Sequence, residues 1–206
     1  MPRTYDDPCG LARALNVVGE RWALLIVREL LLGPKRFTDL RRGLPGASQS
    51  MLTSRLAELE QAGVLRRRRL GPPVASQVYE LTARGQDLSP ALVALSAWGS
   101  REPTASSEEL SVDALALAMR TTFVGASTEI RAQLNVDADH LQVVVAGPEL
   151  TITRGEMPDP DVTITTTATT WRSVIFGGWP LDPASVTGDR DAAAHLVTLF
   201  PRPSRV

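Results

Sequence analysis

Residues 48–70 of the chain read SQSMLTSRLAELEQAGVLRRRRL, an amphipathic segment followed by a run of arginines. Ser48 is a residue type that caps helix N-termini, and Gly63 is one that ends helices. Between them, leucines recur every three to four residues, at positions 52, 56 and 59. The segment therefore predicts a helix over residues 48–62 whose leucines face a core.

The other side of this predicted helix is polar. Near its N-terminus it carries four short polar side chains, those of Gln49, Ser50, Thr53 and Ser54. Glutamine pairs with adenine edges, serine and threonine hydrogen-bond to several bases or to phosphates, and a helix N-terminus itself favours a phosphate. This pattern is typical of a helix that reads the major groove, although an ordinary solvated helix face has the same composition.

Four consecutive arginines follow the helix: Arg66, Arg67, Arg68 and Arg69. Because side chains alternate along a strand, two guanidinium groups would lie on each face. A nearby polyanion relieves the repulsion within such a run, whereas the alternative is a solvated edge strand protected against aggregation. Turn residues at 71–73 and an extended stretch at 76–81 complete a hairpin. We favour a DNA-contacting wing, with the pair Arg66 and Arg68 and the pair Arg67 and Arg69 equally eligible to reach phosphate.

Further helices surround this helix and hairpin. Apolar periodicity predicts them over residues 9–18, 22–33, 37–44 and 82–99. This is the element order of a winged helix-turn-helix, in which the helix from Phe37 to Gly43 supports the reader helix. Phosphate contacts or plain surface solubility would explain the cations that flank the supporting helix, which are Lys35, Arg36, Arg41 and Arg42.

The second half of the chain predicts a mixed fold. Residues 101–109 are rich in Ser, Glu and Pro and have the composition of a linker. Beyond them, the patterns indicate helices over 112–123, 169–176 and 191–200, and strands over 129–136, 141–145, 150–153 and 161–167. We therefore expect an α+β protein with a winged-helix domain over 1–100, a linker over 101–109 and an α+β domain over 110–206.

Charge divides the two halves in the same place. Residues 1–100 carry 14 Lys and Arg against 9 Asp and Glu, whereas residues 101–206 carry 8 against 14. A polyanion would be attracted by the first half and repelled by the second, so we expect nucleic-acid contacts in residues 1–100.

The sequence has few motifs that indicate another class of function, such as an enzyme or a metal-binding protein. His140 and His195 stand apart from any Ser or Cys motif, and no Gly-rich phosphate loop or metal-ligand spacing is visible. We expect no enzyme, no metal and no cofactor. The longest apolar run, residues 22–27, is too short for a bilayer, and the N-terminus lacks the apolar stretch of a secretory signal. We therefore expect a cytoplasmic, nucleoid-associated protein without a membrane partner.

Residues 7–40 closely resemble the opening of HxlR-type, MarR-like regulators. Residues 48–56, followed by 59–60 and 62–65, resemble the recognition helix of that family, Arg55 included, and residues 79–82 with Gly85 resemble its closing strand and turn. The resemblance implies a homodimer that binds double-stranded DNA, with the N-terminal and last helices packed across a two-fold axis. The implied interface residues, for which intramolecular core packing is the alternative, are Leu11, Leu15, Leu88, Leu92, Leu95 and Trp98.

Some relatives of this type use a cysteine near the N-terminus as an oxidant sensor. Cys9, the only cysteine of the chain, stands in a similar place. The resemblance therefore implies a thiol-based redox sensor as one alternative function. An inert side chain is the other interpretation of Cys9.

The second half more loosely resembles the sterol carrier protein type of domain. The resemblance rests on residues 161–166, on the following helix with Trp171, and on residues 183–190 with 196–200. It implies a sheet-and-helix cup around an apolar cavity that holds a small hydrophobic effector. Cavity-lining and ordinary core packing are alternatives for Trp171, Ile175, Phe176 and Trp179. The alternative function is a carrier of hydrophobic ligands, in which the first domain serves only for docking.

Overall fold

The computed structural model describes residues 4–71, 76–102 and 109–202. The chain divides into two compact units, Met1–Leu92 and Val93–Val206. Most of the expected linker, residues 103–108, and part of the expected hairpin turn, residues 72–75, lie outside the described residues.

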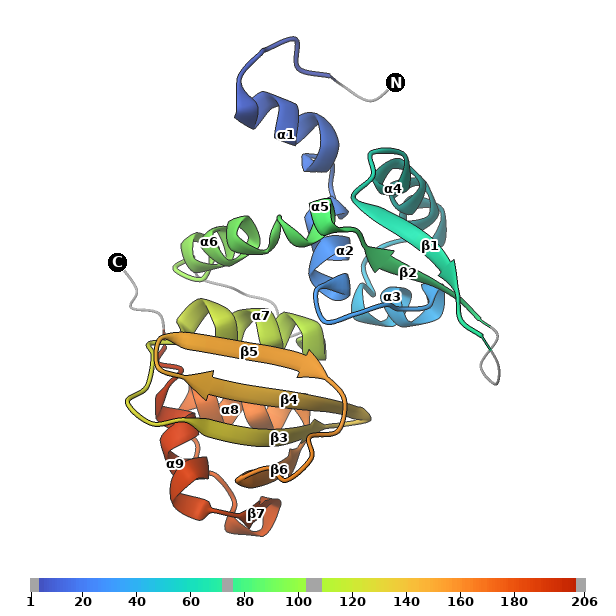
Figure 1. Ribbon diagram of the computed structural model, residues 1–206. Coiled ribbons are helices and arrows are strands. Elements are labelled where there is room, and N and C mark those ends of the chain that lie inside the picture. Colours follow the sequence, from blue (N-terminus) through green and yellow to red (C-terminus); the bar gives the residue numbers. More distant parts are fainter. Residues whose placement is uncertain (1–3, 72–75, 103–108, 203–206) are drawn as a thin grey trace. The chain divides into compact units, whose positions relative to one another are not determined.

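The first unit has the expected order of elements, drawn from blue to green in Figure 1. Its fold is a winged helix-turn-helix. The elements are α1 (Gly10–Val18), α2 (Ala23–Leu30), α3 (Phe37–Gly43), α4 (Gln49–Gln61), β1 (Leu65–Arg69), β2 (Gln77–Leu81), α5 (Ala83–Gln86) and α6 (Ser89–Gly99), of which α6 crosses the division between the units.

The core of the first unit forms where α2 meets α4. Ile26, Val27 and Leu30 on α2 have no exposed surface, and neither do Leu52 and Leu59 on α4. The leucine spacing of residues 48–62 thus buries one face of α4, as expected.

One expected helix of this unit is wrong. The sequence predicts a single helix over 82–99, but the structure has α5 and α6 with a break at Asp87 and Leu88. The reason is Pro90, because its ring would clash with the carbonyl of Gln86 one turn earlier in an unbroken helix. The chain therefore begins a new helix at Ser89.

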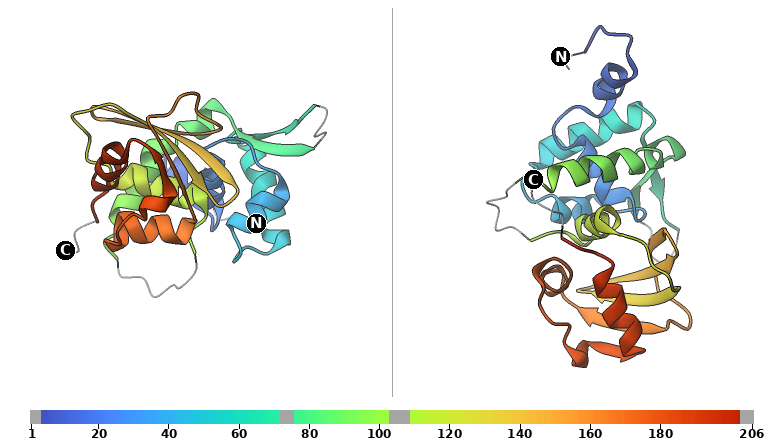
Figure 2. Two further views of the ribbon diagram at one scale, coloured as in Figure 1. Left: turned by 90° about the horizontal axis from the view of Figure 1, so that it is seen from below. Right: turned by 90° about the vertical axis from the view of Figure 1, so that its left-hand side faces the viewer.

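The second unit is a five-stranded sheet with helices on one face. The strands are β3 (Ile130–Val136), β4 (Asp139–Ala146), β5 (Glu149–Arg154), β6 (Val162–Thr166) and β7 (Val186–Gly188), in the order β5-β4-β3-β6-β7. β3 and β6 are parallel and the other pairs are antiparallel. Figures 1 and 2 show α7 (Val112–Thr122) and α8 (Ala168–Gly177) covering one face. The 3-10 helix η1 (Pro183–Ser185) and α9 (Arg190–Thr198) complete the unit.

Most strands of the second unit follow the expected ranges, but β7 is absent from the sequence prediction. It has only three residues, and it pairs with the sheet along one side alone. Gly188, with φ +94°, lets the strand approach β6 closely, since a Cβ there would lie 2.5 Å from the carbonyl oxygen of Asp161. A strand this short has no alternation long enough to be recognised in a sequence.

A partly buried ion-pair network fixes α7 to the sheet. The Arg154 guanidinium on β5 lies 2.7 Å from Asp113, which is almost fully buried at the start of α7, and it also bonds to Asp139. Burial alone would lower the pKa of Arg154, but these two carboxylates raise it above its usual value. Arg154 therefore stays charged and holds the helix in place.

Candidate nucleic-acid interface

The N-terminal half of α4 presents the polar face that the sequence predicts. Ser48 caps the helix, with its hydroxyl accepting the Met51 amide at 3.2 Å, and Gln49, Ser50, Thr53 and Ser54 are exposed. The Thr53 hydroxyl donates to the Gln49 carbonyl at 2.9 Å and keeps its acceptor lone pairs for an outside donor. The face thus offers both donors and acceptors to a ligand.

Arg55, expected among the DNA contacts, lies on the opposite side of α4. It is buried on the same helix face as Leu52 and Leu59. Its guanidinium pairs with Glu58 and lies 3.6 Å from Glu20, in the turn between α1 and α2. This geometry holds α4 against that turn, so Arg55 is a positioning residue for α4.

The turn before α4 is held by a strained tryptophan. Trp22 has φ 78°, a left-handed backbone that bulky residues rarely adopt. Its indole closes on Gly46, where a Cβ would lie 2.9 Å from the ring atom Cη2. A glycine is therefore required at 46, because any side chain there would push the α3–α4 turn away from Trp22.

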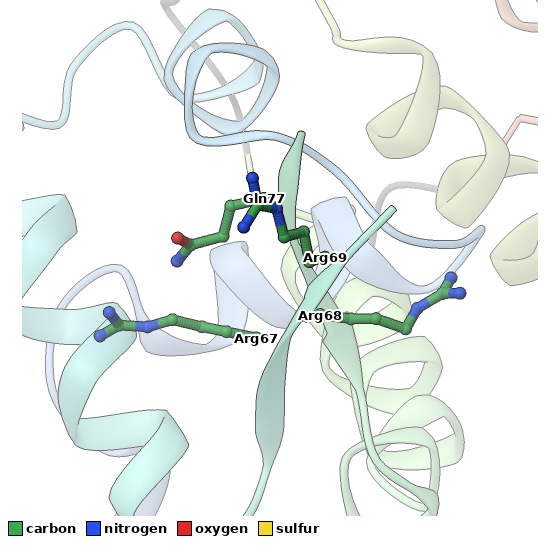
Figure 3. Close-up of a pocket in the computed structure, with 4 residues that line it drawn as sticks. All are labelled: Arg67, Arg68, Arg69 and Gln77. Atoms are coloured by element: carbon green, nitrogen blue, oxygen red, sulfur yellow. The ribbon is translucent and has the colours of Figure 1, made fainter. Parts of the chain in front are cut away.

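The β1–β2 hairpin projects beyond α3 and α4 (Figures 1 and 2). All four arginines, Arg66 to Arg69, are exposed, and Figure 3 shows Arg67 and Arg68 pointing to opposite sides of the strand. Arg67, Arg68 and Arg69 line a surface recess together with Gln77 (Figure 3). The predicted division of two guanidinium groups to each face is present.

Carboxylates that the sequence analysis missed hold three of these arginines. Glu80 on β2 accepts from Arg66 Nε at 2.7 Å and from Arg68 Nε at 2.8 Å. On the other face, Arg67 lies 2.8 Å from Glu60, the carboxylate near the end of α4, and stacks over Tyr79. The β1–β2 register sets Arg66 opposite Glu80, so a correct alignment of the two strands would have predicted the contact between these two residues.

The cations around α3 divide into two groups. Arg36, Arg41 and Arg42 are exposed and available to phosphate, although Arg42 lies 3.3 Å from Asp39. Lys35 instead extends inward, with its ammonium 2.7 Å from the fully buried Glu29. Its backbone exchanges two hydrogen bonds with Tyr79, so Lys35 fastens β2 to the segment before α3.

Comparison with known proteins agrees with this geometry. The family model described as HxlR-like helix-turn-helix matches residues 17–107. The HTH-type transcriptional regulator YodB of Bacillus subtilis is 38% identical over 85 residues, which are 41% of this chain and 76% of YodB. The chain belongs to the HxlR-like helix-turn-helix family.

Other HxlR-like relatives align over a similar length. An uncharacterized HTH-type transcriptional regulator of Synechocystis, sll1512, is 37% identical over 93 residues, 45% of this chain and 68% of that protein. Rv3095 of Mycobacterium tuberculosis, also described as an uncharacterized HTH-type transcriptional regulator, is 43% identical over 89 residues, and the alignment spans 56% of its length. Among solved structures, the redox regulator HypR in its oxidized form is 32% identical with a TM-score of 0.42, over 47% of this chain and 99% of that one.

The residues expected at an HxlR-type dimer interface fall into two groups. Leu11 is 70% exposed, Leu95 50% and Trp98 68%, and Leu15 is also exposed. Leu88 is half-buried and Leu92 is buried, so these two pack within the chain. The side chains of the first group are large and apolar, and they are exposed among the residues that the structure describes.

Cys9 is exposed at the N-cap of α1. Its sulfur accepts the Ala12 amide at 3.3 Å, and its own amide donates to the Asp7 carboxylate at 2.8 Å. The thiol is thus open to a reagent and beside a helix N-terminus.

The four expected ligand-lining residues of the second unit do not share one environment. Trp171 is fully buried, and its indole N–H donates to the Met119 sulfur on α7 at 3.4 Å. Ile175 is also buried and Phe176 is half-buried, whereas Trp179 is 64% exposed. The structure brings Trp171 and Ile175 into the core between α8 and its neighbours.

Neither a membrane span nor a metal centre is found in the described part of the chain. No helix within residues 4–71, 76–102 and 109–202 is long and apolar enough to cross a bilayer. In the same residues, no three His, Cys, Asp or Glu side chains come together as metal ligands.

Proposed function

We propose that this HxlR-like regulator binds double-stranded operator DNA as a homodimer and acts in the cytoplasm on nucleoid DNA. In each copy, α4 would enter the major groove and the β1–β2 wing would lie along the backbone. The observation that carries the proposal is the exposed polar face of α4, next to a projecting hairpin with four exposed arginines.

Contacts in this arrangement divide between affinity and specificity. Phosphate contacts would come from the wing and from Arg36, Arg41 and Arg42, each of them exposed. Such contacts position the protein but carry no sequence information. Base contacts would come from Gln49, Ser50, Thr53 and Ser54, and the helix end at Ser48 would meet a phosphate.

Footprinting on the DNA upstream of the protein's own gene, followed by binding measurements with substituted protein, tests this proposal. We expect Gln49→Ala and Thr53→Ala to reduce the preference for the footprinted site by about 1–3 kcal/mol for each lost base contact. Affinity for random duplex should stay unchanged, since neither side chain is charged. Gln61→Ala, at the exposed far end of α4, is the matched control. Unchanged preference in both variants would contradict α4 as the reader helix.

Cys9 supports a second candidate, a thiol-based response. Its exposure and its place at the start of α1 favour it, and the similar structures include HypR, described as a redox regulator. Mass spectrometry of the native protein after mild diamide, paired with a DNA-binding assay, decides between a sensor and an inert thiol. An unmodified Cys9, or a modified one with unaltered DNA affinity, would remove this candidate.

The second unit supports a third candidate, a sterol-carrier-like domain that binds a small hydrophobic effector. A sheet with helices on one face agrees with that resemblance, and the exposed Trp179 ring lies against Gly177 at the end of α8. Since buried Trp171 and Ile175 are already packed, we assign the ligand contact to Phe176 and Trp179.

Titration of the full chain with a fluorescent fatty acid tests this candidate. We expect saturable binding that an unlabelled fatty acid competes away, and a several-fold weaker affinity in Phe176→Ala, because half-buried apolar area is lost. Thr170→Ala, exposed on the same helix, is the control. Binding together with altered DNA affinity supports an effector; binding in a protein that ignores DNA supports the rival carrier function. Absence of saturable binding contradicts both.

A further inference from the structure

We propose that Glu80 is a positioning residue of the wing, one that orients Arg66 and Arg68 and lowers the affinity of the wing for DNA of every sequence. The inference rests on the proposed function and concerns how tightly the wing holds any duplex. It is carried by the placement of one carboxylate between two exposed guanidinium groups.

The contacts of Glu80 are symmetrical. One carboxylate oxygen lies 2.7 Å from Arg66 Nε and the other lies 2.8 Å from Arg68 Nε. Glu80 itself is 13% exposed, whereas the arginine side chains are 67% and 47% exposed. The carboxylate therefore lies below the arginines, which remain at the surface.

Both bonds use Nε and leave the outer edge of each guanidinium open. For the terminal Nη nitrogens of Arg66 and Arg68, no protein partner is found in residues 4–71, 76–102 and 109–202. An arginine held through Nε has lost much of its side-chain freedom before DNA arrives, so less entropy is lost when Nη meets phosphate. Glu80 thus orients these two side chains in the free protein.

The same carboxylate weakens the attraction of the wing for phosphate. Its negative charge offsets one of the two positive charges on this face, and it repels any phosphate that approaches. Affinity from counterion release is independent of sequence, so Glu80 reduces binding to all duplexes. Binding at an operator also includes base contacts of α4, which Glu80 does not touch. Because the same factor applies to operator and random duplex, the carboxylate lowers both affinities and leaves their ratio unchanged.

This role and a purely structural one predict opposite signs. If Glu80 only stabilised the hairpin, its removal would weaken binding to every duplex. If Glu80 limits non-specific attraction, its removal strengthens binding to random DNA. A single substitution that removes charge and keeps shape separates the two.

The test compares the native full-length protein with Glu80→Gln on the footprinted duplex and on a random duplex across a range of salt concentrations. We expect random-duplex affinity to rise about three- to tenfold at low salt, and the slope of log affinity against log salt to steepen by about 1. Operator affinity should rise by a similar factor, so that the ratio of the two affinities stays close to its native value. Glu80→Asp keeps the charge and should keep the native slope.

Asp87→Asn is the matched control, because it removes one exposed carboxylate just after α5, and no contact of Asp87 with the described wing residues is found. Equal gains in Asp87→Asn and Glu80→Gln would overturn the proposal, since net charge alone would then explain them. Weaker or unchanged random-duplex binding in a Glu80→Gln protein with native circular dichroism would also overturn it. A native protein that binds no duplex would instead overturn the proposed function, and the two failures are thus distinguishable.

Discussion

Replacement of all four wing arginines, Arg66 to Arg69, with alanine should reduce affinity for every duplex by about a hundredfold or more at low salt. The loss should be uniform across sequences, because guanidinium–phosphate contacts carry no base information. Each phosphate contact adds about 0.9 to the salt slope, so four free arginines would contribute about 3.6. Since Glu80 and Glu60 offset part of this charge, we expect the slope to flatten by about 2.

Salt titrations of fluorescence anisotropy measure both quantities on one sample. Arg84→Ala, which removes an exposed arginine of α5 outside the wing, serves as the control. Native affinity and native slope in the quadruple variant would show that the hairpin does not touch DNA. A changed preference among sequences, with total affinity retained, would indicate that the wing contacts bases and not the phosphate backbone.

Trp98→Glu should convert the proposed dimer into monomers. Trp98 is 68% exposed on α6, one helical turn after the exposed Leu95, and in the proposed dimer a second copy would cover both side chains. Burial of a carboxylate there without a partner weakens the free energy of dimerisation by several kcal/mol. The dimer dissociation constant should therefore rise by a factor on the order of 10² to 10³. Operator affinity should also fall, because a dimer that contacts two half-sites binds about 10² to 10⁴ times more tightly than a monomer that contacts one.

Sedimentation equilibrium of the native protein and of the variant reports the masses directly. Ser100→Glu adds the same charge just beyond α6 and should leave the dimer intact. A Trp98→Glu protein that still sediments as a dimer would place the interface on another surface. A native protein that is monomeric at every concentration would contradict the homodimer itself.

Local patterns predicted helix α4 and most strands correctly. Leucine spacing and the Ser48 cap act within a few residues, and the structure has both the cap and the buried leucines. The break between α5 and α6 was also visible in the sequence, because Pro90 forbids a continuous helix there. That error came from extending the apolar stripe through a proline.

Arg55 shows where local patterns fail. It follows four exposed polar positions of α4, but a helix turns 100° per residue and brings Arg55 back to the leucine face. A buried guanidinium requires a paired carboxylate, and besides Glu58 on the same helix Arg55 has Glu20 at 3.6 Å, 35 positions earlier in the chain. Lys35 is similar, because the buried Glu29 draws its ammonium inward.

By itself, the sequence determined the element order of the first unit, the polar face of α4 and the four-arginine hairpin, because caps, periodicity and strand alternation are short-range properties. Only the tertiary structure decided which charges remain available to DNA. Glu80 and Glu60 reach the wing from β2 and α4, and a carboxylate finds its arginine through strand register and helix packing. Those distances are set by the fold as a whole, so the net charge of the binding surface cannot be read from a run of arginines.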